Sequence, residues 1–162
     1  MDEIRLLKTL EKQSNMNVQD LSDILNESVE EVTSTIKELE AKQVICGYHT
    51  VINWDKTSTE KVQAMIEVSA KPTRDKGYDY VASKIYRYPE VSTMYLMSGK
   101  SEFSLIIDGK TMREVADFVA QKLAPIDGVR ETVTSFVLKP YKVEGVILEE
   151  DYKDDQRLLV TP

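Results

Sequence analysis

The chain has 162 residues but only one cysteine, one histidine and six glycines, and these shortages exclude several kinds of site. A lone cysteine makes no intrachain disulfide, which fits a reducing compartment, and we expect Cys46 to be a small buried apolar residue. The single histidine, His49, leaves no cluster with metal-ligand spacing. The glycines stand apart and form no phosphate-binding loop. We therefore expect no metal, no cofactor and no catalytic residues.

Long apolar runs are also missing. No stretch approaches the roughly 20 residues that span a bilayer. The first ten residues, MDEIRLLKTL, begin with two acids and lack a long apolar core, so we expect no secretory signal. The composition, 41% hydrophobic and 30% charged, is that of a folded globular protein. We expect it to be cytoplasmic and to have no membrane partner.

Positive charge is scarce, and it is scarcest near the start of the chain. The net charge is −7; residues 1–53 hold ten acids and five bases, and residues 54–162 hold 18 acids and 16 bases. This balance argues against non-specific attraction to phosphate. Any DNA-binding function has to be reconciled with it.

The first fifty residues have the apolar periodicity of three helices. We expect Asn17 to cap the second helix and Asn26 to end it in the left-handed conformation. Ser28 and Glu31 fit an S-x-x-E capping box that opens the third helix. Three helices, with about three residues between the second and third, describe a helix-turn-helix. The residues expected to face the core are Ile4, Leu7, Leu10, Leu21, Ile24, Leu25, Val32, Ile36 and Leu39.

The periodicity then changes to that of strands. Residues 44–54 are rich in β-formers and predict a connecting strand, and a polar linker follows. Residues 62–70 alternate as a half-buried strand does. A helix (78–87), two strands (91–98 and 103–108), a helix capped by Thr111 and Glu114, and a strand (129–138) complete a β-α-β-β-α-β order. The buried stripe of the last helix is expected to be Met112, Val115, Ala116, Val119 and Leu123.

The predicted fold class is therefore α+β, with an N-terminal winged-type helix-turn-helix followed by a ferredoxin-like βαββαβ domain. The domains are expected at residues 1–50 (DNA-binding), 51–61 (connecting strand and linker), 62–143 (effector binding and oligomerisation) and 144–162 (C-terminal tail). In such a fold both helices cover one sheet face. Successive side chains of residues 94–97 point to opposite faces, and both pairs, Met94 with Leu96 and Tyr95 with Met97, are large and apolar. With Met65 and Ile106, one of these pairs would leave the other face apolar, which predicts a twofold homodimer packed sheet to sheet. The alternative is that the tail folds back over this face.

This layout resembles the leucine-responsive/asparagine-C (feast/famine) family of transcription regulators over nearly the whole chain. The third-helix pattern of that family is recognisable in SVEEVTSTIKELEAKQVICGY, and its second-domain pattern in YLMSGKSEFSLII and DGVRETVTSFVL. The resemblance implies a dimer that often assembles into tetramers or octamers, double-stranded DNA as partner, and a small effector, typically an amino acid. It places the effector where dimers meet, near the loop Gly99-Lys100-Ser101-Glu102.

On this basis we assign two sets of candidate residues. Backbone donors near Gly99 suit a carboxylate, and Glu102 suits an α-ammonium; the alternative is an ordinary hairpin in which Gly99 supplies unusual backbone angles. The candidate effector residues are Ser98, Gly99, Lys100, Ser101, Glu102, Thr132 and Thr134. The candidate DNA contacts, to phosphates or bases, are Gln19, Ser28, Thr33, Ser34, Thr35 and Lys37.

Two positions depart from the pattern of the family. Thr35 stands where the family commonly has an arginine, and a threonine can make only one short hydrogen bond to DNA. Glu102 stands where the loop of the family usually ends in aspartate, so the effector itself does not carry over. Two alternatives remain: a ligand-sensing co-regulator with little DNA binding of its own, and a sirohaem-decarboxylase-like enzyme, which a single histidine disfavours.

Overall fold

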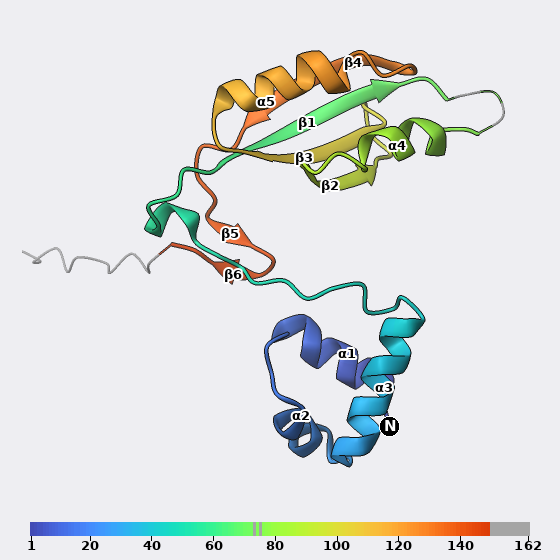
Figure 1. The fold of residues 1–162 in the computed structure, drawn as a ribbon, viewed down its shortest axis with the longest axis vertical. Helices are drawn as coiled ribbons and strands as arrows, with labels where there is room; N and C mark the ends of the chain where they lie inside the picture. Colours follow the sequence, from blue (N-terminus) through green and yellow to red (C-terminus); the bar gives the residue numbers. More distant parts are fainter. Residues whose placement is uncertain (73, 75, 150–162) are drawn as a thin grey trace, which may run out of the picture. The chain divides into compact units, whose positions relative to one another are not determined.

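The computed structural model describes residues 1–72, 74 and 76–149, which form two compact units divided between Ile52 and Asn53 (Figure 1). The first unit holds three helices: α1 (Glu3–Lys12), α2 (Val18–Leu25) and α3 (Val29–Ala41). Their facing sides form one small core of Leu6, Leu10, Leu21, Leu25, Val32 and Leu39. Among the described residues, no helix combines the length and the apolar character needed to cross a membrane.

The helix boundaries are set by local chemistry. The side chain of Asn17 accepts a hydrogen bond from the backbone of Asp20 at 2.8 Å, so it caps α2 as predicted. Asn26 ends α2 with φ 59° and ψ 47°, which confirms the left-handed residue. Residues 26–28 therefore turn the chain sharply before α3 begins.

The prediction that Ile4 and Ile24 face the core of this unit is wrong, because Ile4 is 61% exposed and Ile24 is 45% exposed. In α1 the buried residues are Leu6 and Leu10, four apart, and Ile4 lies on another side of the helix. In α2 the buried residues are Leu21, Ser22 and Leu25, and Ile24 lies on another side of the helix. The buried hydroxyl of Ser22 is satisfied, because it donates to the carbonyl of Glu27 at 2.6 Å.

The predicted connecting strand is not formed. Residues 46–53, all of them described, contain no strand, and a short 3-10 helix, η1 (Trp54–Lys56), follows. Strand-forming side chains are not sufficient where no neighbouring strand supplies the ladder hydrogen bonds. Cys46, expected to be buried, is exposed, and its thiol donates to the carbonyl of Gln43.

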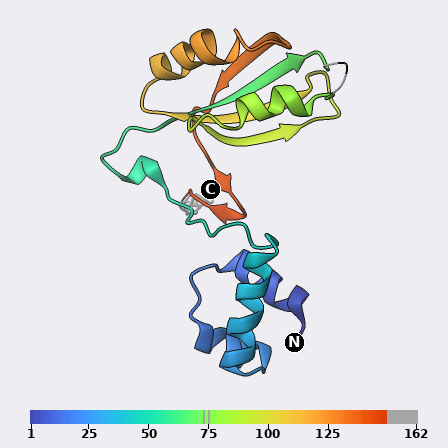
Figure 2. The ribbon, with the colours of Figure 1, turned by 45° about the vertical axis from the view of Figure 1, so that its right-hand side comes forward.

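The second unit is built on a four-stranded antiparallel sheet with the order β2-β3-β1-β4. The strands are β1 (Val62–Ala70), β2 (Val91–Leu96), β3 (Phe103–Gly109) and β4 (Val129–Phe136). Helix α4 (Asp79–Ile85) connects β1 to β2, and α5 (Met112–Phe118), continued by the π-helix η2 (Val119–Leu123), connects β3 to β4. Both helices lie on the same face of the sheet, as Figure 2 shows. The chain is thus α+β.

The alternation predicted for β1 is confirmed: Ala64, Ile66, Val68 and Ala70 are buried under the helices. Met65 points to the opposite face, where its partner in register is Ile106. Tyr95 (59% exposed) and Val133 (48% exposed) alternate onto this helix-free face too. A small hairpin of β5 (Lys142–Val143) and β6 (Val146–Ile147) follows, and the rest of the predicted tail, residues 150–162, lies outside the described residues.

The buried stripe of α5 was only partly predicted. Val115 and Leu123 are buried and Val119 is half-buried, but Met112 and Ala116 are exposed. Phe118 takes the inward position instead, with its ring edge-to-face against Tyr88 at 5.5 Å between centroids. Met112 and Ala116 lie in α5 itself, turned away from the side of the helix that buries Val115 and Phe118.

Candidate DNA-binding helix and candidate effector loop

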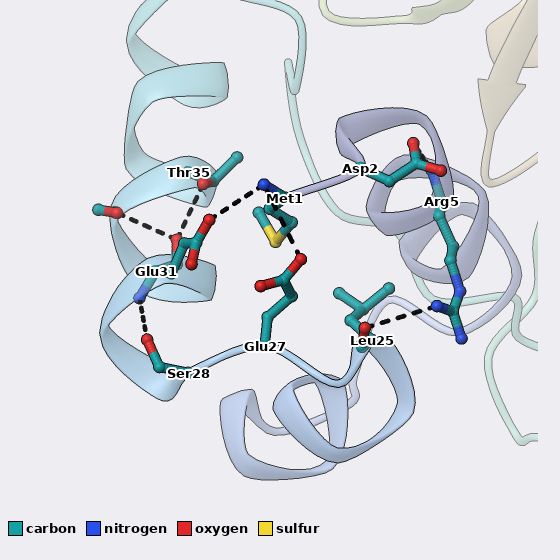
Figure 3. Close-up of polar contacts among 9 residues, drawn as sticks. Met1, Asp2, Arg5, Leu25, Glu27, Ser28, Glu31 and Thr35 are labelled. Carbon is teal, nitrogen blue, oxygen red and sulfur yellow. Dashed lines mark hydrogen bonds and ion pairs between the residues drawn. The ribbon is translucent and has the colours of Figure 1, made fainter.

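Helix α3 begins at a side-chain cap. The Ser28 hydroxyl accepts a hydrogen bond from the backbone N–H of Glu31 at 3.1 Å, which confirms half of the predicted capping box (Figure 3). The carboxylate of Glu31 does not return to Ser28. It accepts from the ammonium group of Met1 at 3.0 Å, and Glu27 lies 3.8 Å from the same nitrogen. The hydrogen bond that the amine donates to Glu31 and the negative charges of Glu31 and Glu27 raise the pKa of that amine.

Three of the four hydroxyls predicted to contact DNA already donate hydrogen bonds within α3. Thr33 donates to the carbonyl of Val29 at 2.7 Å, and Thr35 to that of Glu31 at 2.8 Å. Ser34 donates to the same Glu31 carbonyl at 3.0 Å. A hydroxyl has one proton but two lone pairs, so each of these oxygens can still accept a hydrogen bond.

The remaining candidates on this unit are arranged differently. Lys37 is exposed on α3. Gln19 is exposed on α2, where its amide lies 3.4 Å from the carboxylate of Asp23. At the far end of α3, Lys42 donates to Glu38 at 2.6 Å, and this hydrogen bond lowers the pKa of Glu38. Among the described residues, Lys37 is therefore the one unpaired cation on the exposed surface of α3, which also carries several acids.

The candidate effector loop joins β2 to β3. The backbone N–H of Met97 donates to the carbonyl of Glu102 at 2.8 Å, which closes the loop around residues 98–101. Ser98, Gly99 and Lys100 are exposed, whereas Ser101 and Glu102 are half-buried. The carboxylate of Glu102 accepts from the backbone N–H of Ala70 at 2.8 Å, so it holds the loop against the end of β1.

β2 and β3 do form a hairpin, but the unusual backbone angles expected of Gly99 in it are not found. The φ of Gly99 does not lie in the left-handed region, and a Cβ built there would meet nothing within 4 Å. Neither backbone angles nor crowding requires glycine at this position, which leaves room for a ligand as an explanation.

Thr132 and Thr134 are not brought to the loop within one chain. They pair with Val68 and Ile66 of β1, so their side chains point to the helix-covered face. β1 separates them from β3, and two strand spacings amount to about 10 Å. The predicted ferredoxin-like order already places β1 between β4 and β3, so grouping these threonines with the loop did not follow from the predicted fold.

Sequence reasoning also missed Arg5. Its guanidinium donates to the carbonyl of Ile24 at 2.6 Å and lies 3.5 Å from that of Leu25, where α2 ends. A cation at a helix C-terminus satisfies carbonyls that have no partner within the helix. Among the described residues there is also no group of His, Cys, Asp and Glu side chains able to hold a metal ion.

Comparisons with known proteins agree on one family. Residues 63–147 match the Lrp/AsnC ligand-binding domain. The chain is 40% identical over 161 residues to the HTH-type transcriptional regulator YugG of Bacillus subtilis, covering 99% of this chain and 96% of that protein. It is 28% identical to the HTH-type transcriptional regulator LrpA of Pyrococcus abyssi, covering 85% of this chain and 94% of that one.

Among solved structures, the transcriptional regulator NMB0573 of Neisseria meningitidis, in complex with L-methionine, is similar with a TM-score of 0.68. It is 24% identical, and the match covers 86% of this chain and 90% of that chain. At this identity the likeness shows a shared fold. The named relatives are transcriptional regulators, which removes the support for a decarboxylase.

Proposed function

Because the chain belongs to the family of Lrp/AsnC regulators, we propose that it is a DNA-binding transcriptional regulator controlled by an amino acid. The first unit is a winged-type helix-turn-helix head that binds double-stranded DNA. The second is a ferredoxin-like βαββαβ domain that binds the effector and oligomerises. The observation that carries the proposal is the 40% identity to a transcriptional regulator over 99% of this chain.

The geometry of the head supports its role. Helices α2 and α3 are joined by three residues, with Asn26 in the left-handed conformation, as a helix-turn-helix requires. Helix α3 would enter the major groove with its N-terminal residues, starting at Ser28. The contacts we propose are those of Gln19, Ser28, Thr33, Ser34, Thr35 and Lys37.

The hydrogen bonds inside α3 refine what these contacts are. Phosphate oxygens only accept, so a hydroxyl must donate to reach one, and the donors of Thr33, Ser34 and Thr35 are already used. Their lone pairs suit the exocyclic amino groups that adenine and cytosine present in the major groove. We therefore assign Ser34 and Thr35 to base edges and Lys37 to a phosphate.

The effector would lie at the β2–β3 loop. The loop residues from Ser98 to Ser101 are accessible, and Glu102 offers a carboxylate to an ammonium group while it holds Ala70. A related fold has been solved with L-methionine, which supports an amino acid as the class of effector. The strand order β2-β3-β1-β4 supports the ferredoxin-like arrangement of this domain.

The helix-free sheet face supports the dimer. Met65, Ile106, Tyr95 and Val133 share it, and an apolar face of this kind is stabilised by packing against a second copy. Dimers would then assemble further into tetramers or octamers, with the effector biasing one assembly over another.

The test is DNA binding by the full chain, measured as fluorescence anisotropy against salt with and without each of the twenty amino acids. If the chain is a regulator, we expect it to bind the DNA upstream of its own gene and at least one amino acid to change its affinity for that DNA. The acidic head favours a second candidate, a ligand-sensing co-regulator. That candidate would bind an amino acid but show no DNA binding at low salt.

A further inference from the structure

The few cations of the head are unevenly placed. Of the five bases in residues 1–53, three lie on α1: Arg5, Lys8 and Lys12. Their spacing of three and four residues puts them on one side of the helix, opposite Leu6 and Leu10 in the core. All three are exposed, and with Thr9 and Gln13 they line a shallow hollow of about 480 Å³. We call Arg5, Lys8 and Lys12 the α1 cation stripe.

The lysines of the stripe are not ion-paired within the described part of the head. The carboxylate of Asp2 lines the same hollow and adds one negative charge there, while it accepts from the backbone N–H of Arg5 at 3.1 Å. Among the described residues, neither Lys8 nor Lys12 lies within ion-pair distance of a carboxylate, in contrast to Lys42 with Glu38. Two exposed ammonium groups therefore remain available in a unit of net charge −5.

The position of the stripe relates it to the start of α3. The Met1 ammonium bonds Glu31 in the first turn of α3, so α1 starts beside the end of α3 that is proposed to enter the groove (Figure 3). From Arg5 to Lys12 the helix rises about 10 Å, at roughly 1.5 Å per residue. One strand of DNA carries a phosphate about every 3.4 Å of axis, so the stripe spans about three phosphates.

We propose that the α1 cation stripe is the surface by which the head holds the sugar-phosphate backbone of DNA. The inference rests on the proposed function and deepens it, because it assigns phosphate binding and base recognition to different helices. Helix α3, with one lysine among four glutamates, reads base edges, and α1 supplies the charge that releases counterions. An acidic α3 is then compatible with DNA binding.

The test is the salt dependence of DNA binding by the full chain, with a labelled duplex of mixed sequence. The variants are Lys8→Gln, Lys12→Gln and the double variant; Arg5 is kept because it bonds the end of α2. Each phosphate contact adds about 0.9 to the slope of log K against log salt. We expect each single variant to flatten the slope by about 0.9 per bound head, and the double variant by about 1.8.

The matched control is Lys42→Gln, which removes the same charge from an ion-paired lysine of the same head and should leave the slope unchanged. If the double variant keeps the wild-type slope of log K against log salt, the inference is overturned and the proposed function stays intact. No DNA binding by the wild-type chain overturns the proposed function itself. Loss of self-association in the double variant, with an unchanged slope, assigns the stripe to a protein partner and also overturns the inference.

Discussion

Glu102 gives the sharpest test of the effector loop, because its carboxylate has a structural task and a proposed binding task. One oxygen accepts from the backbone of Ala70 at 2.8 Å and so ties the loop to β1. Replacement by alanine removes both tasks. Replacement by glutamine keeps an oxygen that can accept the Ala70 hydrogen bond but removes the charge that an ammonium group requires.

The two replacements differ in their expected free energies. A hydrogen bond to a charged group contributes about 1.5–3 kcal/mol, and half-exposure of Glu102 favours the lower end. We expect Glu102→Ala to reduce the free energy of unfolding by about 1.5 kcal/mol and Glu102→Gln by less than about 1 kcal/mol. For the effector, loss of a charge-assisted contact of about 1.5 kcal/mol weakens binding roughly tenfold in both variants.

The assay uses Trp54, the only tryptophan, which lies in the same unit as the loop. Its fluorescence in urea reports the stability of that unit, and calorimetric titration with amino acids reports effector binding. If Glu102→Gln binds the effector as tightly as the wild-type chain, the carboxylate does not contact the ammonium group. If Glu102→Ala is as stable as the wild type, the bond to Ala70 contributes nothing.

Three further predictions concern stability. Ser28→Ala should cost about 1 kcal/mol through loss of the α3 cap, whereas Ser28→Asp should keep helix stability by circular dichroism and weaken DNA binding; tight binding by the aspartate variant would contradict this. Gly128→Ala should lower the free energy of unfolding, measured in urea, by roughly 2–4 kcal/mol, because φ is 97° and the new Cβ would lie 2.6 Å from Val81. Adding Val81→Ala should recover part of this loss. If the losses of the two single variants simply add in the double variant, the clash with Val81 is not the cause. Lys122 donates to Glu90 and lowers the pKa of that carboxyl below its ordinary value, so the pair stabilises the fold above the ordinary pKa and this stabilisation is lost as pH falls through the lowered pKa. Glu90→Gln should therefore make Tm depend less on pH in the acid range. The same dependence of Tm on pH in the variant and the wild type would contradict this prediction.

What the sequence predicted well was local. The caps at Asn17, Ser28 and Thr111 each depend on a side chain and a backbone N–H three residues later. Such contacts follow from the sequence spacing alone, so they can be predicted without knowledge of the tertiary packing. The alternation of β1 was equally readable, because one of its faces is covered along its whole length.

What the sequence could not predict depends on distant partners. Ser22 is buried in α2 with its hydroxyl satisfied at Glu27, while Ile24 is exposed. Residues 46–53 form no strand because no neighbouring strand pairs with them. Glu102 was correctly singled out, but its bond to Ala70 joins residues 32 apart. The candidate threonines of β4 were grouped with the loop although β1 lies between them.

The hydroxyls of α3 show both what sequence spacing predicts and what it cannot predict. Spacing alone marked the neutral side chains left to meet DNA, which are those of Ser28, Thr33, Ser34 and Thr35. It could not show that the last three donate to their own helix. A phosphate contact by any of them exchanges one hydrogen bond for another, with little net gain. Acceptance from a base amino group adds a bond and breaks none. The affinity of the proposed head must therefore come from its few cations and from several heads acting together, whereas α3 contributes selectivity.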